Sequence, residues 1–227
     1  MVGAKLDAMP EAMRKAFNIS SFTDFSDLLQ YFAYCFQYIA MAGCIYSAIL
    51  GASSLIKEES DGTIEFLYSK PVSRTKIVTA KLVSNLLLLI VFNTVIFAIS
   101  FIGCMLVAPE NYQFAMPLAR LIKLEFIIQA VYFSIGFMIS TVLPSSRQAN
   151  PAALGIFFIT YILGIFSQVI DKLKNLKYIS PYNYALPANI VKNDYIMDTA
   201  YIALIISIIF ISMAVTYLRY NKKDMRI

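Results

Sequence analysis

The chain has 227 residues, of which 59% are hydrophobic and 15% are charged, and its formal net charge is +5. So large an apolar fraction cannot be buried inside a water-soluble core of this size, which excludes a soluble globular protein. The sequence contains no histidine, which excludes Ser-His and Cys-His hydrolases and His-ligated zinc proteases.

Five charge-free apolar stretches occur along the chain, and each is long enough to cross a bilayer. They cover residues 28–56, 82–109, 126–146, 148–170 and 199–218. A backbone in hydrocarbon must satisfy its own hydrogen bonds, and these stretches are continuous rather than alternating, so helices are favoured over a barrel. The sequence predicts an all-α, polytopic membrane protein whose five spans lie at about 30–54, 82–107, 121–143, 152–170 and 199–218.

Residues 1–29 precede the first span and are polar. The stretch MPEAMRKAF (9–17) suits an interfacial amphipathic helix, and the cluster SSFTDFSD (20–27) suits a helix cap. A tail without structure is the alternative. The first span contains small residues that allow close helix packing in lipid, so we expect it to pack against protein; these residues are Ala40, Ala42, Gly43, Ala48, Gly51 and Ala52.

A charged segment, residues 57–81, separates the first two spans. Its breakers predict that one helix ends at 60–62, that a short helix covers 63–69, and that a helix capped by Ser73 runs from Arg74 into the second span. A short helix at the membrane surface suits insertion into a partner's groove. An ordinary polar loop is the alternative, and the physical properties of these residues alone favour it.

Polar residues inside the second and third spans are candidates for a substrate path: Asn85, Asn93, Glu125 and Gln129. For the two asparagines, hydrogen bonding between helices is the favoured alternative. Glu125 and Gln129 lie one turn apart and therefore share a helix face. Glu125 either pairs with basic residues at the membrane surface or, if it is deeper, is a functional candidate because burial of a carboxylate is costly.

The last two loops differ in character. Residues 144–151 predict a tight turn, whereas residues 171–198 are rich in tyrosine, contain Pro181 and Pro187, and are typical of an interfacial loop. Ten of the 19 Lys and Arg lie on the side that holds 57–81 and the C-terminus, and nine lie on the other, so charge counting does not decide the orientation. The basic tail, 219–227, favours a cytoplasmic C-terminus and an N-terminus outside.

Several chemical motifs are absent from the sequence. There is no GxxxxGK[ST] phosphate-binding loop, so we expect no cofactor on this chain and assign any ATP binding to a partner. Cys35, Cys44 and Cys104 lie inside predicted spans without CxxC spacing, so we expect packing roles rather than a disulfide or a metal site. The basic residues are scattered over the loops, which favours membrane flanks over nucleic-acid binding.

Two stretches resemble the permease subunits of type-2 ABC exporters. Residues Glu58-Glu59, Asp61–Leu67, Ser69–Arg74 and Lys81 resemble the "E, GT-E-L, s-P-v-s-R, K" signature of that family. Leu176–Tyr184 (LKYISPYNY) resembles the "L-k-Y-l-S-P-f-k-Y" stretch that such permeases carry before their last span. Family permeases typically have six spans, so the resemblance implies that about one N-terminal span is missing here.

The resemblance implies a non-catalytic permease subunit with a permease domain at 30–218. It would form a homodimer or heterodimer in the lipid bilayer and couple ATP hydrolysis by separate ATP-binding cassette subunits to substrate efflux. It assigns partner coupling to Glu58, Glu59, Gly62, Thr63, Glu65, Pro71 and Arg74. The alternatives are an ATP-independent secondary transporter and a truncated or accessory membrane protein without transport activity.

Overall fold

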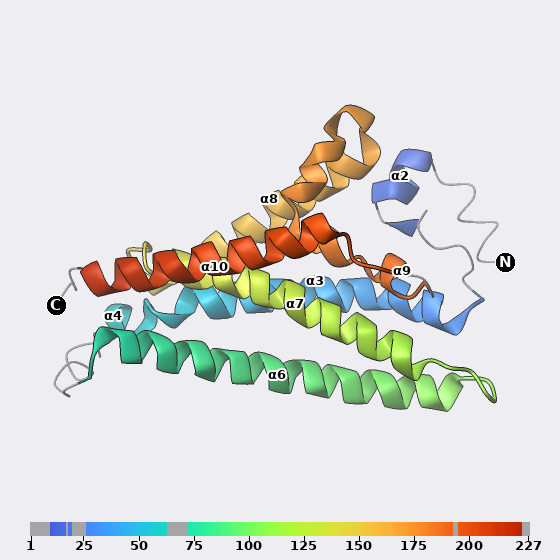
Figure 1. The fold of residues 1–227 in the computed structure, drawn as a ribbon, viewed down its shortest axis with the longest axis horizontal. Helices are drawn as coiled ribbons and strands as arrows, with labels where there is room; N and C mark the ends of the chain where they lie inside the picture. The colour runs from blue at the N-terminus through green and yellow to red at the C-terminus, as the bar shows by residue number, and fades with distance from the viewer. Residues whose placement is uncertain (1–9, 17, 20–25, 63–71, 193–194, 224–227) are drawn as a thin grey trace.

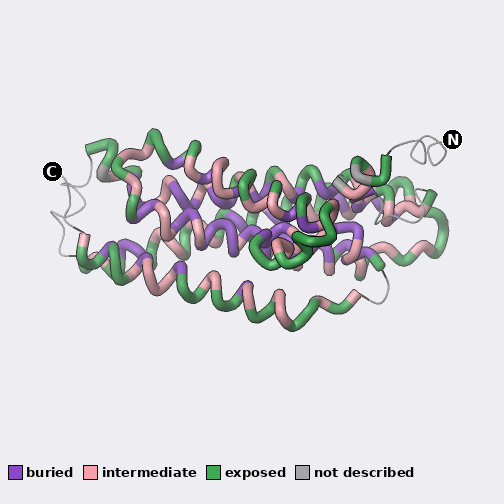
Figure 2. The backbone as a smooth tube through the Cα atoms, turned by 90° about the horizontal axis from the view of Figure 1, so that it is seen from above, coloured by how far each residue is buried: buried purple, intermediate pink, exposed green. Residues whose placement is uncertain are grey.

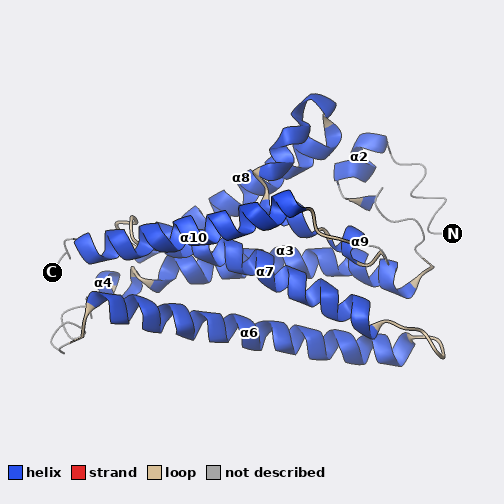
Figure 3. Ribbon diagram, viewed as in Figure 1, coloured by secondary structure: helices blue, strands red, loops and turns tan. Residues whose placement is uncertain are grey.

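The computed structural model describes residues 10–16, 18–19, 26–62, 72–192 and 195–223, and every regular element in these ranges is a helix (Figures 1 and 3). Five helices are long and apolar enough to cross a membrane. They are α3 (Leu28–Ser54), α6 (Arg74–Val107), α7 (Ala115–Ser140), α8 (Ala149–Val169) and α10 (Thr199–Lys222). The prediction of an all-α polytopic protein with five spans is therefore confirmed.

The connecting elements are short. They are α2 (Glu11–Ala16), α4 (Lys57–Ser60), α9 (Pro187–Ile190) and three 3-10 helices, η2 (Ser146–Gln148), η3 (Asp171–Tyr178) and η4 (Pro181–Ala185). In Figure 1, α3, α6, α7 and α10 run along the long axis, whereas α8 is inclined away from them and α2 lies beside its far end. The start of α6 and the end of α10 lie at one end of the bundle, together with α4.

Side-chain caps fix the starts of three helices. The carboxylate of Asp27 accepts a hydrogen bond from the backbone N–H of Gln30 at 2.9 Å, which confirms the expected cap before the first span. Ser73 caps α6 as predicted, and its backbone is extended as a cap position requires. Asp198 caps α10 through the N–H of Ala200 at 3.0 Å. Each cap satisfies an N–H group that has no partner within its helix.

The core lies between α3 and α7, the most extensively packed pair of helices. The small residues of α3 other than Ala42 are buried, which confirms that this span packs against protein. In Figure 2 the buried residues run along the interior of the bundle, while exposed residues cover its outside. α3 and α7 therefore form a close-packed centre against which the other helices lie.

Helix α6 is long, and little of its surface is buried against the other helices. It has 34 residues and few of them are buried. At 1.5 Å per residue this helix is about 51 Å long, whereas the hydrocarbon core is about 30 Å thick, so α6 protrudes or tilts. Its start at Arg74 confirms that the helix runs from the charged segment into the second span without a break.

Several helix boundaries differ from the predicted spans, most of all at the starts of α7 and α8 and at the end of α10, which continues to Lys222. α7 begins at Ala115 rather than at about 121, because helical backbone continues beyond the charge-free stretch and carries Arg120 and Lys123. α8 begins at Ala149, so Pro151 lies in its first turn rather than before it. Proline fits there because the first N–H groups of a helix have no internal partner.

Residues 171–198 depart from the expected interfacial loop. Most of the segment folds into η3, η4 and α9, and Pro181, Tyr182 and Pro187 are buried. The hydroxyl of Tyr182 donates a hydrogen bond to the backbone carbonyl of Gln37 in α3 at 2.8 Å. Part of this connection therefore belongs to the core.

Candidate functional site

The first candidate site is the end of the bundle that carries residues 57–81. Here α4 follows α3 after Leu55 and Ile56 and ends at Ser60, and Asp61 is its C-cap. Gly62 has φ +68°, a left-handed conformation that glycine adopts without strain. The predicted helix break at 60–62 is therefore present. Thr63, Glu65 and Pro71, and the short helix expected at 63–69, lie outside the described residues.

A polar connection joins α3 and α4 to α6. The ammonium of Lys81 forms an ion pair with Glu58 and also donates to the backbone carbonyl of Ser54. The amide of Asn85 donates to the hydroxyl of Ser54 at 2.7 Å. The side chains of Lys81 and Glu58 are only 19% and 31% exposed, so water screens this pair less than it would a surface pair. Glu59 lies beside Glu58 in α4.

Arg74 joins the start of α6 to the end of α10. Its guanidinium donates to the backbone carbonyls of Asn221 at 3.1 Å and Lys223 at 2.7 Å, with a longer contact to that of Tyr220 at 3.5 Å. The last carbonyls of a helix have no internal partner and carry partial negative charge, so a cation is favourable there. Arg74 thus stabilises the C-terminus of the last span.

Further hydrogen bonds complete this end of the bundle. Ser60 of α4 accepts from the N–H of Ser146 at 3.2 Å and shares a hydroxyl contact with it at 2.8 Å, which connects α4 to the turn between α7 and α8. Thr79 of α6 contacts the hydroxyl of Tyr217 in α10 at 2.9 Å. The residues that flank 63–71 therefore contact the ends of α3, α6 and α10 and the turn that leads into α8.

The second candidate site is a polar cluster in the middle of the bundle. Glu125 and Gln129 of α7 are 2% and 1% exposed, and the predicted sharing of one helix face is confirmed. The thiol of Cys44 in α3 donates to Glu125 at 3.2 Å, and the amide of Asn93 in α6 donates to Gln129 at 2.7 Å. The cluster thus connects α3, α7 and α6 by side chains that would be costly to leave unpaired in hydrocarbon.

The four residues predicted for a substrate path therefore do not form one group. Asn93, Glu125 and Gln129 belong to the central cluster, whereas Asn85 belongs to the Glu58 and Lys81 connection. Both asparagines form hydrogen bonds with a side chain of another helix. This agrees with the interpretation favoured from the sequence, which was hydrogen bonding between helices. Asn93 also lines a mostly apolar cavity of about 320 Å³ between α6 and α7, and Asn85 lines one of about 260 Å³ beside Glu58.

Several partners in these sites were missed from the sequence. Ser54 and Tyr217 have no distinguishing signal, because each is an ordinary polar residue near a helix end. Cys44 was expected only to pack, but its thiol also binds Glu125.

In the described part of the chain, no three His, Cys, Asp or Glu side chains are grouped so that they could hold a metal ion.

Comparison with known proteins identifies one family. The family model described as "ABC-2 family transporter protein" matches residues 4–225, almost the whole chain. No curated protein matches the chain.

Proposed function

Because the chain belongs to the ABC-2 transporter family, as a multi-pass membrane protein with five apolar helices, we propose that it is the permease subunit of an ATP-binding cassette exporter. ATP hydrolysis would take place on a separate ATPase subunit. The chain would act as a homodimer or heterodimer, with its C-terminus in the cytoplasm and its N-terminus outside. Substrate would leave the cell by alternating access.

The observation that carries this proposal is the set of contacts around residues 57–81. A partner that binds this segment would act on Glu58 and Arg74, which contact α6 and α10. It would also act on Ser60, which contacts the turn before α8. One docking event at the membrane surface could thereby shift several spans together, as alternating access requires. Glu59, Gly62, Thr63, Glu65 and Pro71 complete the proposed coupling surface.

The packing of α6 favours this helix as the moving part. α3 and α7 are close-packed, whereas α6 is largely exposed and is joined to them by polar contacts at Lys81, Asn85 and Asn93. A force on Lys81 would be transmitted along one continuous helix to Asn93. Movement of α6 away from α7 would uncover Gln129 and Glu125, and we assign these residues and Asn93 to the substrate path.

Co-purification tests the proposal. We would replace residues 60–76 with a Gly/Ser linker and, separately, change Glu65→Arg, then ask whether a P-loop ATPase co-purifies from detergent-solubilised membranes. Glu110→Arg is the matched control, because Glu110 is exposed in the α6–α7 loop at the other end of the bundle. ATPase recovery should be lost with the linker and with Glu65→Arg and kept with Glu110→Arg.

Two results would contradict the proposal. The first is well-folded, unaltered protein that yields no ATPase, which would favour an ATP-independent transporter or an inactive membrane protein. The second is undiminished ATPase recovery with the linker variant, which would place the docking surface elsewhere.

A further inference from the structure

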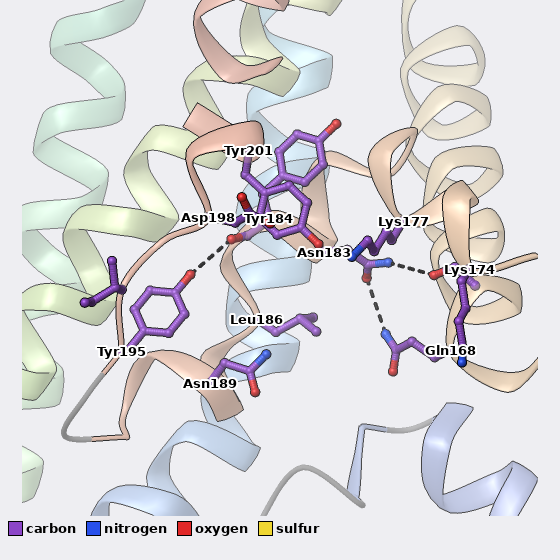
Figure 4. Close-up of a pocket in the computed structure, with 12 residues that line it drawn as sticks. Gln168, Lys174, Lys177, Asn183, Tyr184, Leu186, Asn189, Tyr195, Asp198 and Tyr201 are labelled. Atoms are coloured by element: carbon purple, nitrogen blue, oxygen red, sulfur yellow. Dashed lines mark hydrogen bonds between the residues drawn. The ribbon is translucent and has the colours of Figure 1, made fainter. Parts of the chain in front are cut away.

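A cavity of about 330 Å³, lined by charged, polar and apolar side chains, lies between η3, η4 and the adjoining ends of α8 and α10 (Figure 4). Neither candidate site described above includes it. Spans that run in sequence alternate in direction, so this cavity and residues 57–81 lie at opposite ends of the bundle. Its volume falls within the range of sites that hold small ligands.

Hydrogen bonds within the chain hold one wall of this cavity in place. Gln168 of α8 donates to the side-chain oxygen of Asn183, and the amide of Asn183 donates to the hydroxyl of Ser167, each at 3.4 Å. Gly164 permits this approach, because a Cβ there would lie 2.8 Å from the Asn183 amide nitrogen and 2.6 Å from the Ser180 hydroxyl. The polar groups are thus positioned by the fold and not by a ligand.

Aromatic rings form the opposite wall. Tyr184 and Tyr201 are stacked with ring centroids 4.8 Å apart, and the hydroxyl of Tyr195 donates to the backbone carbonyl of Tyr184 at 3.2 Å. Burial raises the pKa of Tyr184 to about 12, and its hydroxyl donates to the backbone carbonyl of Tyr178. Tyrosines of this kind are enriched where a span meets the membrane surface.

The charges that line the cavity give it an excess of one positive charge. Lys174 and Lys177 lie on one side of it, and Asp198 lies on the other. Lys174 also forms an ion pair with Asp171 at 3.0 Å, but both side chains are largely exposed, so this pair holds Lys174 only weakly. Lys177 is half-buried, with its ammonium 4.9 Å from the centre of the Tyr178 ring, while the carboxylate of Asp198 is engaged in capping α10. A ligand group with a single negative charge matches this arrangement.

We propose that this cavity binds the headgroup of a membrane phospholipid that carries a net negative charge. Lys174 and Lys177 would supply the charge, and the side-chain amide of Gln168 would supply a hydrogen bond. The position of the cavity favours a lipid, because the apolar run of α10, which is long enough to cross a membrane, begins directly after Asp198.

Exposed apolar side chains continue from the cavity along α10. Ile202, Ile206 and Phe210 follow Asp198 at intervals of four residues, so they share its helix face, and they are 42%, 62% and 72% exposed. An acyl chain attached to a headgroup in the cavity could lie along this face. A soluble phosphate ester would also bring negative charge but would gain nothing from contact with this face.

Native mass spectrometry of the full chain in detergent tests this proposal. The probes are a short-chain phosphatidylglycerol, a phosphatidylcholine of the same chain length and soluble glycerol phosphate. We expect phosphatidylglycerol to be retained preferentially, and Lys174→Gln and Lys177→Gln each to weaken its retention about fivefold, as expected for one lysine near an anionic headgroup. Lys177→Arg should retain most of the binding, because it keeps the charge.

Lys172→Gln is the matched control, because Lys172 is exposed on the same 3-10 helix but does not line the cavity. Equal weakening by Lys172→Gln would overturn the proposal in favour of general attraction to the surface. Equal retention of phosphatidylcholine would also overturn it, because the cavity would then not select a net negative charge. Glycerol phosphate that competes as well as the lipid would assign the cavity to a soluble phosphate ester. Absence of lipid adducts from folded, unaltered protein would also overturn it.

Discussion

Gly51 of α3 and Gly136 of α7 lie against each other where the two helices cross. A Cβ built on Gly51 would lie 3.1 Å from the carbonyl carbon of Gly136 and 2.3 Å from the carbonyl oxygen of Phe133. A Cβ on Gly136 would lie 2.3 Å from the carbonyl oxygen of Ala48. The backbones therefore touch at this point, which only glycine at both positions allows.

Alanine at either glycine should separate the two central helices. We expect Gly51→Ala and Gly136→Ala each to lower the free energy of unfolding by about 1–3 kcal/mol, because the clash is with backbone atoms that cannot move aside. Denaturation of the purified protein by SDS measures this effect. Gly103→Ala and Gly155→Ala are the controls, because nothing lies within 4 Å of a Cβ at these positions. A similar loss in the controls would show that helical glycines matter here for another reason.

The ion pair between Glu58 and Lys81 should contribute measurably to stability. It is partly buried, so we expect a coupling free energy of about 1 kcal/mol, at the upper end of the range for exposed pairs. A double-mutant cycle with Glu58→Gln and Lys81→Gln measures it, and Lys76→Gln, an exposed change on the same helix, is the control. Zero coupling would mean that other contacts hold α6 to α4.

Around residues 57–81, local sequence patterns predicted where helices begin and end, but they did not predict which side chains form hydrogen bonds with one another. Gly62 and Ser73 were identified as a helix break and a cap because each acts on its own backbone. Ser54 was not identified as the partner of Lys81 and Asn85, because the neighbours of a helix depend on how the whole bundle packs.

The same limit explains the segment before the last span. From the sequence, Pro181 indicates a break in a helix and Tyr182 suits a membrane surface. Neither residue type shows whether the segment lies against lipid or against protein. Only the structure shows that Tyr182 reaches Gln37 in α3. In the central cluster, the shared face of Glu125 and Gln129 was predictable from their spacing, but the contacts with Cys44 and Asn93 were not.

Replacement of Arg74 by lysine should loosen the end of α10 although the charge is kept. The guanidinium presents several donors in one plane, whereas an ammonium on a shorter chain cannot reach the same set of carbonyls. We expect faster amide hydrogen exchange in the last turn of α10, near Tyr220, in Arg74→Lys. Arg219→Lys is the control, because Arg219 is a nearby arginine of α10 itself. Unchanged exchange in Arg74→Lys would show that these carbonyls are satisfied without the guanidinium.

The hydrogen bond between Asn93 and Gln129 should give a non-additive pair of substitutions. Asn93→Leu leaves the Gln129 amide oxygen without its donor inside the bundle, so we expect a loss of about 0.6–1.7 kcal/mol, the range for such bonds in membranes. Asn93→Leu combined with Gln129→Leu should cost less than the sum of the single changes, because neither member of the Asn93–Gln129 bond is then left without the other. SDS denaturation measures all three variants, and Thr94→Val, next to Asn93 but exposed, is the control. Simple additivity would mean that the two side chains act independently and that α6 is not held to α7 by this bond.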